Sequence, residues 1–415
     1  MAEQPVYIDV IFLAAGVAFF ALLAAGRRAP AIRWWLPLPP FLAIVSLAVA
    51  GRWSGATGFV NALAAPQRLS VLAAMVLAGV LYTYGAWTRP RWAALLLAVM
   101  AGAYAAACWS GPFRVRAVEP DNIPITLLIF GLAFVLWIAL RRSAINDAHL
   151  ERGEPLPDAD PEERVTTWPH LVFLELIALV ICTAGLIVWS ILVRAPLEPP
   201  ADPTISPNPA KAPWYFVGVQ ELLVYFDPWI AGVVVPVLIV LGLCALPYLD
   251  RNRQGEGYYT VARRPAAVAI FLAGFVLLWV MPIVIGAFLR GPNWSLFGPF
   301  ETPDPLRTPS VTNVNLSQRV WGWFGAPGMA GLDGTGGMLL REMPGIVLLS
   351  GYAVVTAWAL KAKVFKQASA QMGFTRYAIL AVLLLAMGLV PIKMLLRWLL
   401  DIQYIVAFTE WSLNV

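Results

Sequence analysis

The chain consists of long, continuously apolar runs separated by short polar segments. Of its 415 residues, 60% are hydrophobic and only 13% are charged, whereas soluble domains carry about 25% charged residues. A helix needs roughly 20 apolar residues to cross a membrane, and a membrane-spanning barrel would instead alternate in polarity over segments of about ten residues. We therefore predict an all-α, polytopic transmembrane helical bundle. About ten runs qualify as spans: Val10–Ala25, Trp34–Ala50, Leu69–Trp87, Trp92–Trp109, Ile123–Leu140, Leu171–Val193, Pro228–Tyr248, Ala266–Leu289, Pro344–Leu360 and Tyr377–Leu399.

The distribution of positive charge predicts the orientation of these spans. Of the 29 Lys and Arg residues, 17 fall in loops that follow odd-numbered spans. Cytoplasmic loops are enriched in such residues, so both termini are expected on the outer, positive side of a bacterial cytoplasmic membrane. The net charge of +5 comes from these loops and indicates contact with anionic lipid headgroups, and not with nucleic acid.

A proline-rich stretch between two apolar runs organises the middle of the chain. It reads PADPTISPNPAKAPWY from Pro200 to Tyr215. Its prolines exclude a helix up to about Ala212, whereas residues 214–226 can form a short surface helix. The pattern alone fits either a rigid connector between two spans or the wall of a binding site.

This stretch resembles subunit IV of the cytochrome b6f complex, which corresponds to the C-terminal part of cytochrome b in bc-type complexes. The family motif PADPxxTPxxxxPEWY is matched without a gap at residues 200–203, 206–207 and 214–215. Three flanking motifs at span boundaries agree as well: Trp168-Pro169, Pro247-Tyr248-Leu249-Asp250 and Arg263-Arg264-Pro265. The resemblance covers about residues 166–288, is looser over 373–415, and does not extend to the first 120 residues or so.

The resemblance implies a haem-free membrane subunit of a bc/b6f-type quinol–cytochrome c oxidoreductase, which contributes the outer-side quinol-oxidation pocket. Two haems with paired histidine ligands need four imidazoles, and this chain has only His149 and His170. Haem b is therefore expected in a partner that resembles the N-terminal part of cytochrome b. A Rieske iron–sulfur protein, a c-type cytochrome or both are further expected partners. The chain alone is expected to bind no cofactor and no metal, because its three cysteines form no CxxC or CxxCH motif, and the quinone is expected at the subunit interface.

The site residues follow from the same motif. The family's PEWY glutamate is thought to accept the quinol proton, but the ungapped match puts Pro213 at that position. Glu221 and Asp227 are the nearby acids that could replace it. Glu221 is preferred because desolvation in its apolar helix favours proton uptake, although a headgroup-level polar residue without a catalytic role is an equal alternative. The residues expected to wall the quinone site or to bond the quinone are Pro213, Trp214, Tyr215 and Tyr225.

Five segments are expected along the chain. They are an N-terminal block of four spans (1–117), a linking helix with an acidic cytoplasmic loop (118–165), the subunit IV-like core (166–290), a long outer loop (291–343) and a two-helix extension (344–415). The N-terminal block is expected to be a scaffold or an assembly surface. Near the end of the last span, Lys393 and Arg397 are expected to reach the outer headgroups, with an inter-subunit salt bridge as the alternative.

Two other classes of function stay open. A structural subunit of a respiratory or photosynthetic supercomplex, without its own active site, is favoured by Pro213 at the glutamate position. A secondary transporter would show inverted repeats or broken helices with charges inside the membrane, and the sequence shows neither.

Overall fold

The structure of the chain is a computed structural model. It describes residues 6–26, 35–50, 55–156, 166–192, 200, 202–204, 206–250, 259–309, 313–332, 334–364, 366, 369, 372–411 and 413–415. Parts of the expected acidic loop and of the proline-rich motif, residues 157–165, Ala201 and Ile205, lie outside this set, as does Trp34.

The structure is 76% helical with almost no strands, which confirms the all-α prediction. Eight of its helical segments are long and apolar enough to cross a membrane. A ninth is a pair of helices, Ala56–Leu63 and Pro66–Tyr82, bent by 80° where Pro66 begins the second helix. The strands β1 (Ala407–Phe408) and β2 (Leu413–Asn414) form only a short antiparallel ladder.

The second predicted span, Trp34–Ala50, is shorter than expected. The helix begins at Leu38 and has 13 residues, which is about 20 Å at 1.5 Å per residue. The apolar core of a membrane is about 30 Å thick, so this helix alone does not cross it. Pro39 and Pro40 occupy the first turn of the helix, a position where proline is tolerated because its missing N–H has no partner there.

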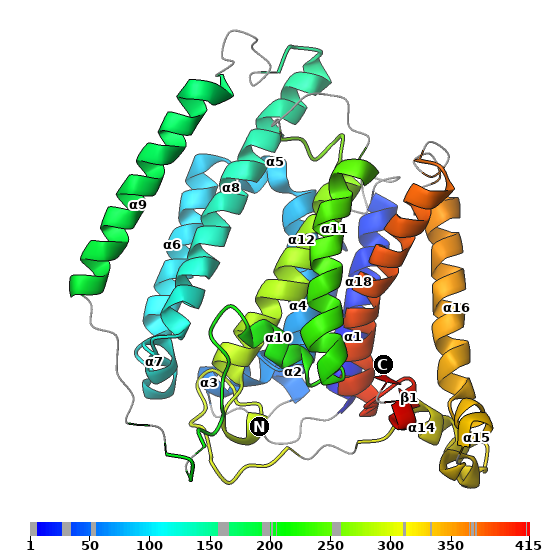
Figure 1. Cartoon of the computed structure of the whole chain (residues 1–415). Coiled ribbons are helices and arrows are strands. Elements are labelled where there is room, and N and C mark those ends of the chain that lie inside the picture. Colours follow the sequence, from blue (N-terminus) through cyan, green and yellow to red (C-terminus); the bar gives the residue numbers. More distant parts are fainter. Residues whose placement is uncertain are drawn as a thin grey trace.

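The N-terminal part of the chain folds into a helical block (Figure 1). Buried apolar residues of the first two helices, such as Phe12 and Leu47, pack with Ala62 of the third. Asp9 in the first helix accepts hydrogen bonds from Gln67 and from buried Arg68 at the start of the fourth. The helices are α1 (Val6–Gly26), α2 (Leu38–Ala50), α3 (Ala56–Leu63), α4 (Pro66–Tyr82), α5 (Tyr84–Trp87), α6 (Pro90–Ala107), α7 (Gly111–Ala117) and α8 (Asn122–Arg152).

The central part contains a helix at the edge of the bundle and a helical hairpin in its middle (Figure 1). The edge helix, η4 (Thr167–Leu171) with α9 (Val172–Leu192), has no buried residue in its apolar window. The short helix α10 (Val217–Leu222) lies at one end of the hairpin. The hairpin consists of η5 (Ile230–Val234) with α11 (Val235–Leu249), and of α12 (Pro265–Leu272), η6 (Ala273–Val280), α13 (Met281–Val284) and η7 (Ile285–Leu289).

The C-terminal part adds two long helices and a layer of short elements below them (Figure 1). The long helices are α16 (Met343–Ala359), extended by η10 (Leu360–Val364), and α18 (Phe374–Leu400). The short elements are η8 (Pro292–Trp294), α14 (Leu316–Trp323), η9 (Pro327–Gly331), α15 (Gly334–Arg341) and η11 (Thr409–Trp411), next to β1 and β2.

The first turn of α1, α10, α14, α15 and β1 lie at the same end of the long helices (Figure 1). Hydrogen bonds between distant segments agree with this arrangement. Asn414 of β2 donates to Asp227 after α10, and Asn61 of α3 accepts from the backbone N–H of Phe300. We call this end the α10 end. Its assignment to the outer side of the membrane stays a prediction.

Lys393 is placed differently from the expectation. Its side chain is 0% exposed, its Nζ donates to the carbonyl of Gln403, and it lies 5.6 Å from the ring centroid of Tyr404. The segment after α18 folds back over the helix end and covers the ammonium group, so Lys393 does not reach the headgroups. Arg397, four residues later, donates to the side-chain oxygen of Asn313 at 2.7 Å.

Candidate functional site

The proline-rich loop is fastened to α10 by one glutamine. The side-chain oxygen of Gln220 accepts a hydrogen bond from the backbone N–H of Ala212 at 2.7 Å, and its amide nitrogen donates to the carbonyl of Ala210 at 2.8 Å. Prolines leave few backbone donors in such a loop, so a side chain that bonds both backbone groups fixes its path.

Two further contacts hold the loop on the end of the hairpin. Lys211 Nζ donates to the carbonyl of Ala287 at 2.7 Å, and burial lowers the pKa of this ammonium group. Asn208 Nδ2 donates to Asn293 Oδ1 at 2.9 Å, and the backbone N–H of Asn293 donates back to Asn208 Oδ1 at 2.6 Å. The loop therefore lies against the last turn of η7 and the segment that follows it.

Two glycines allow α10 to approach the hairpin closely. A methyl group at Gly218 would lie 2.8 Å from Ile283 Cγ1 and 3.3 Å from the carbonyl oxygen of Trp279. A methyl group at Gly286 would lie 3.0 Å from Val217 Cγ2 and 3.1 Å from the Val217 carbonyl oxygen. Glycine at both positions lets the two backbones pack almost in contact, as in other membrane helix pairs.

This close packing buries a bidentate ion pair between α10 and the end of the hairpin. Glu221 is 0% exposed, and the Arg290 side chain is 7% exposed. Arg290 Nη2 donates to Glu221 Oε1 at 2.7 Å and Arg290 Nε donates to Glu221 Oε2 at 2.8 Å, while Nη1 donates to the carbonyl of Trp294 at 2.8 Å. Burial alone would lower the pKa of Arg290, but the Glu221 carboxylate outweighs it and raises that pKa. The guanidinium group is therefore charged at any physiological pH.

Tyr225 extends this pair to the last long helix. Its hydroxyl donates to Glu221 Oε1 at 3.0 Å and accepts from Trp398 Nε1 at 3.1 Å. Burial, with the nearby Glu221 carboxylate, raises the pKa of Tyr225 well above its ordinary value. The side chain is 1% exposed, so this predicted quinone-binding residue lies in the protein core.

Asp227 lies apart from this network. Its carboxylate is partly buried, and Oδ2 accepts from Asn414 Nδ2 at 3.0 Å, while Oδ1 accepts from the backbone N–H of Trp229 at 3.2 Å. Each carboxylate oxygen has two acceptor sites. Both oxygens of Asp227 thus keep one site beyond the bonds described.

The remaining predicted residues line up at the start of α10. Trp214 packs into the cluster that contains Ile125 of α8 and Val217. Pro213 and Tyr215 face outward, and Tyr215 is 48% exposed. The Tyr215 ring lies 4.9 Å from that of Phe216, which is 55% exposed, so the loop presents an aromatic surface away from the chain's own core.

The structure thus separates the six predicted residues into three places. Pro213 and Tyr215 are exposed before α10 while Trp214 between them packs inward, Glu221 and Tyr225 belong to a buried network, and Asp227 is bonded to the C-terminal strand. Sequence reasoning missed Arg290 and Trp398. The available signal was Glu221 itself, a single acid in an apolar helix. A buried charge needs a buried partner, so this acid indicated a basic residue beside it, although not which one.

Each of the two histidines lies next to one polar side chain. His170 Nδ1 hydrogen-bonds the hydroxyl of Thr166 at 2.8 Å, and His149 Nδ1 lies 3.1 Å from Glu154 Oε2. Within the described ranges, no three His, Cys, Asp or Glu side chains form a metal-binding group.

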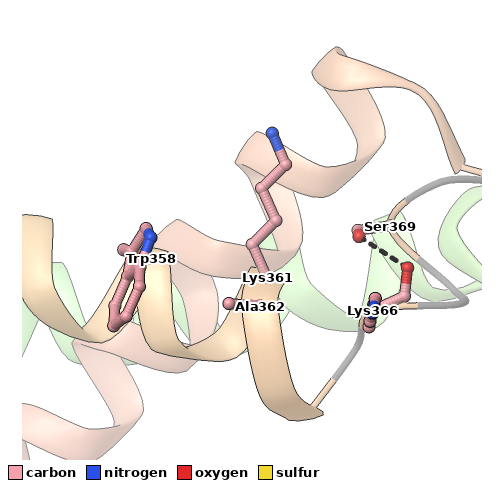
Figure 2. A pocket seen from close by; sticks show the side chains of 5 residues that line it. All are labelled: Trp358, Lys361, Ala362, Lys366 and Ser369. Atoms are coloured by element: carbon pink, nitrogen blue, oxygen red, sulfur yellow. Dashed lines mark hydrogen bonds between the residues drawn. The ribbon is translucent and has the colours of Figure 1, made fainter.

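Two cavities lie away from these residues. One, of about 640 Å³, lies where α16 ends and is lined by Trp358, Lys361, Lys366 and Ser369. Figure 2 shows the Lys361 side chain extending away from Trp358, with Ser369 donating to the carbonyl of Lys366 at 3.1 Å. Its lysines are exposed and suit a lipid headgroup region. The second cavity, of about 340 Å³, lies between the N-terminal block and the hairpin, and its lining is apolar, with side chains such as Ile129 and Phe288.

Comparison with known families agrees with the geometry of the loop and the hairpin. Residues 200–291 match the family described as cytochrome b(C-terminal)/b6/petD. No solved structure matches the chain. The matched residues begin at the proline-rich loop and end just after Arg290, so they comprise the loop, α10, the ion pair and the hairpin. The chain therefore contains a cytochrome b C-terminal, subunit IV-type domain, the type found in bc/b6f-type membrane complexes of electron transport.

Proposed function

We propose that this chain is a haem-free subunit of a quinol–cytochrome c oxidoreductase of the bc/b6f type in a bacterial cytoplasmic membrane. Its role is to supply one wall of the outer quinol-oxidation pocket. The observation that supports this most strongly is the family match over residues 200–291, which covers the loop and both helices of the hairpin. The haems belong to a partner that resembles the N-terminal part of cytochrome b, and a Rieske protein or a c-type cytochrome accepts electrons.

The exposed aromatic surface at the start of α10 is the proposed wall. Pro213, Tyr215 and Phe216 are exposed there. A quinol ring needs an apolar pocket that excludes water, and one exposed surface does not enclose it. The partner subunit therefore closes the pocket from the other side.

The edge helix α9 supports a partner in the membrane. None of the residues in its apolar window is buried by the rest of the chain. Glu175 lies on this helix and is exposed, although a carboxylate is costly in lipid. A partner helix against α9 would shield Glu175.

Of the two predicted proton acceptors, the hydrogen bonds favour Asp227. Glu221 Oε1 already accepts from both Arg290 and Tyr225, and Oε2 accepts from Arg290, so Glu221 takes a proton only if the ion pair opens. Asp227 keeps free acceptor sites and is partly exposed. We therefore assign proton acceptance to Asp227, and we assign to Glu221 the role of holding α10 and its aromatic wall in position.

The test is quinol-dependent cytochrome c reduction by the complex purified through this chain. Asp227→Asn should lower kcat by about a hundredfold, a typical effect of losing a general base. The matched control is Asp304→Asn in the outer loop, which should change kcat less than twofold. Asp304 is exposed, and its carboxylate accepts a local hydrogen bond from the backbone N–H of Leu306. Full activity of Asp227→Asn would refute the assignment of the base. A haem-containing complex without any quinol oxidation would refute the function.

A structural subunit without its own site is the second candidate. Pro213 at the position of the family's glutamate, together with the engagement of Glu221 in the ion pair with Arg290, favours it. In that case Tyr215→Ala would leave the Km for quinol and kcat of the complex unchanged, whereas a pocket wall predicts a higher Km.

A further inference from the structure

The apolar cavity lies between two places where the N-terminal block packs on the end of the hairpin. On one side, Ile129 of α8 packs against the cluster that contains Phe288. On the other side, Ala64, just before α4, and Leu69, in its first turn, pack against the cluster that contains Leu289. All of these side chains line the cavity. The two contacts therefore leave a space between α4 and α8, next to the last turns of the hairpin.

Hydrogen bonds fix the part of the lining that lies at the α10 end. Pro299 belongs to this part. The carbonyl of its neighbour Gly298 accepts a hydrogen bond from Nη1 of buried Arg116 at 2.7 Å. On the other side of Pro299, the backbone N–H of Phe300 donates to Asn61 Oδ1 at 2.8 Å. The segment around Pro299 is thus attached to α7 and α3, so the shape of the cavity is defined before a ligand binds.

The chemistry of the lining suits an apolar guest. Among the described residues that line the cavity, only Tyr104 and Thr126 carry a hydroxyl group, and none is charged. The two hydroxyl oxygens lie 3.2 Å apart, and Thr126 Oγ1 also lies 3.1 Å from the carbonyl oxygen of Asn122, so both hydroxyls have partners in the chain. An engineered apolar cavity of about 150 Å³ stays dry and binds benzene. The cavity here, at about 340 Å³, has room for a larger apolar guest.

Membrane-spanning helices supply most of the lining. Met100 lies on α6, Ile129 on α8 and Val284 on the hairpin, and each of these segments is long and apolar enough to span a membrane. Next to the lining residues, Val99 of α6 is 59% exposed and Leu127 of α8 is 65% exposed. Exposed apolar faces of membrane spans meet the hydrocarbon core of the bilayer. The hydrocarbon chains of lipids are therefore the apolar molecules that surround the cavity.

We propose that this cavity binds one hydrocarbon chain of a membrane phospholipid. The chain contacts Phe113 and Phe130 of the N-terminal block and Phe288 of the hairpin, all of which line the cavity, and so joins the two parts of the protein. A hydrocarbon chain loses no hydrogen bond on entering, whereas a ligand with a polar group would lose its bonds to water without replacement. The role is structural, and no covalent bond forms or breaks. It is separate from the proposed function, because the N-terminal block lies outside the family match at residues 200–291.

The first experiment counts the phospholipid that stays with the protein. The complex purified through this chain is washed extensively in mild detergent, and mass spectrometry of the extracted lipids gives the phospholipid content per chain. Ala64→Phe puts a ring into the cavity and should carry one phospholipid fewer than the wild type. The matched control Ala103→Phe adds the same ring at an exposed position of α6 and should lose none. Equal phospholipid content in all three proteins would overturn the proposal, as would the loss of an isoprenoid molecule in place of a phospholipid.

A second measurement needs only the wild type and decides the question if Ala64→Phe does not fold. The complex is incubated with a phosphatidylcholine that carries a diazirine in the middle of one acyl chain, and it is irradiated before or after the detergent wash. Labelled residues are then mapped by mass spectrometry. Label on Met100, Ile129 or Val284 should survive the wash, whereas label on Val354 of α16, which is 70% exposed, should be lost. Label on Val354 before the wash without any label on the lining would refute the site. Neither measurement uses turnover, so an inactive quinol pocket leaves both intact.

Discussion

The ion pair between Glu221 and Arg290 should be strongly coupled in stability. We compare Glu221→Leu, Arg290→Met and the double variant. Glu221→Leu leaves the charge of Arg290, whose side chain is 7% exposed, without a partner. Arg290→Met leaves the charge of Glu221, whose side chain is 0% exposed, without its guanidinium partner. Breaking a buried pair by removing one partner costs about 3–5 kcal/mol of unfolding free energy, because the other charge is left without compensation.

The double variant should cost less than either single variant. It removes both charges and leaves two apolar side chains of similar length, an exchange that is often neutral or stabilising. The carbonyl of Trp294 loses its bond from Arg290 Nη1 and the Tyr225 hydroxyl loses its acceptor Glu221 Oε1, but each of these losses also occurs in one of the single variants and therefore cancels in the coupling energy. The coupling energy, the difference between the double variant and the sum of the singles, should therefore be at least about 3 kcal/mol.

The assay is reversible unfolding in mixed micelles, followed by far-UV circular dichroism for the wild type and the three variants. Additive effects, with a coupling below about 0.5 kcal/mol, would show that the two side chains do not depend on each other. That result would refute the role of the pair in fixing α10 on the hairpin, and Glu221 would return as a candidate proton acceptor.

Three further outcomes are expected from unfolding measurements. Gly218→Ala should lower the free energy of unfolding by about 1–3 kcal/mol, because the added methyl group meets Ile283. Gly232→Ala, which has no atom within 4 Å of the added methyl group, should be neutral or slightly stabilising. Equal effects of the two variants would contradict the close approach of α10 to the hairpin. Asp147→Ala should lower the free energy of unfolding by about 2–3 kcal/mol. Asp147 accepts hydrogen bonds from Tyr84, from Thr260 and from the backbone N–H groups of residues 261 and 262. An unchanged unfolding midpoint would exclude Asp147 as a link between the N-terminal block and the hairpin. The pKa of Lys211 in the folded state is below its ordinary value of 10.5, so the unfolded chain binds more protons as pH rises toward 10.5. The wild type should therefore gain stability relative to Lys211→Met over this range. A constant difference in melting temperature between the two proteins from pH 7 to 10 would contradict this.

The apolar runs were predictable because the membrane imposes a local requirement. A span needs about 20 consecutive apolar residues, and a sequence displays this directly. The exception, Trp34–Ala50, shows the limit of the rule: the run is apolar, yet its helix begins only at Leu38, next to Pro39 and Pro40. Composition alone does not give the helix start.

The motif gave the place of the site but not its internal contacts. Residues 200–215 predicted the loop, and the family match begins at the same residue. The partner of Glu221 lies 69 positions away, and only the folded hairpin brings Arg290 beside it. Lys393 was placed wrongly for a different reason: the segment that covers it follows directly after α18 and supplies the Gln403 carbonyl, and the helical pattern does not show that this segment folds back.

The most direct test of the central claim is a purification of the native complex through this chain in mild detergent. A reduced-minus-oxidised spectrum and identification of the co-purifying proteins follow. The account predicts a b-haem signal that belongs to a separate subunit, together with an iron–sulfur or c-type partner. A preparation without haem and without a redox partner would contradict it, and the loop at residues 200–215 would then be an inherited structure with another use.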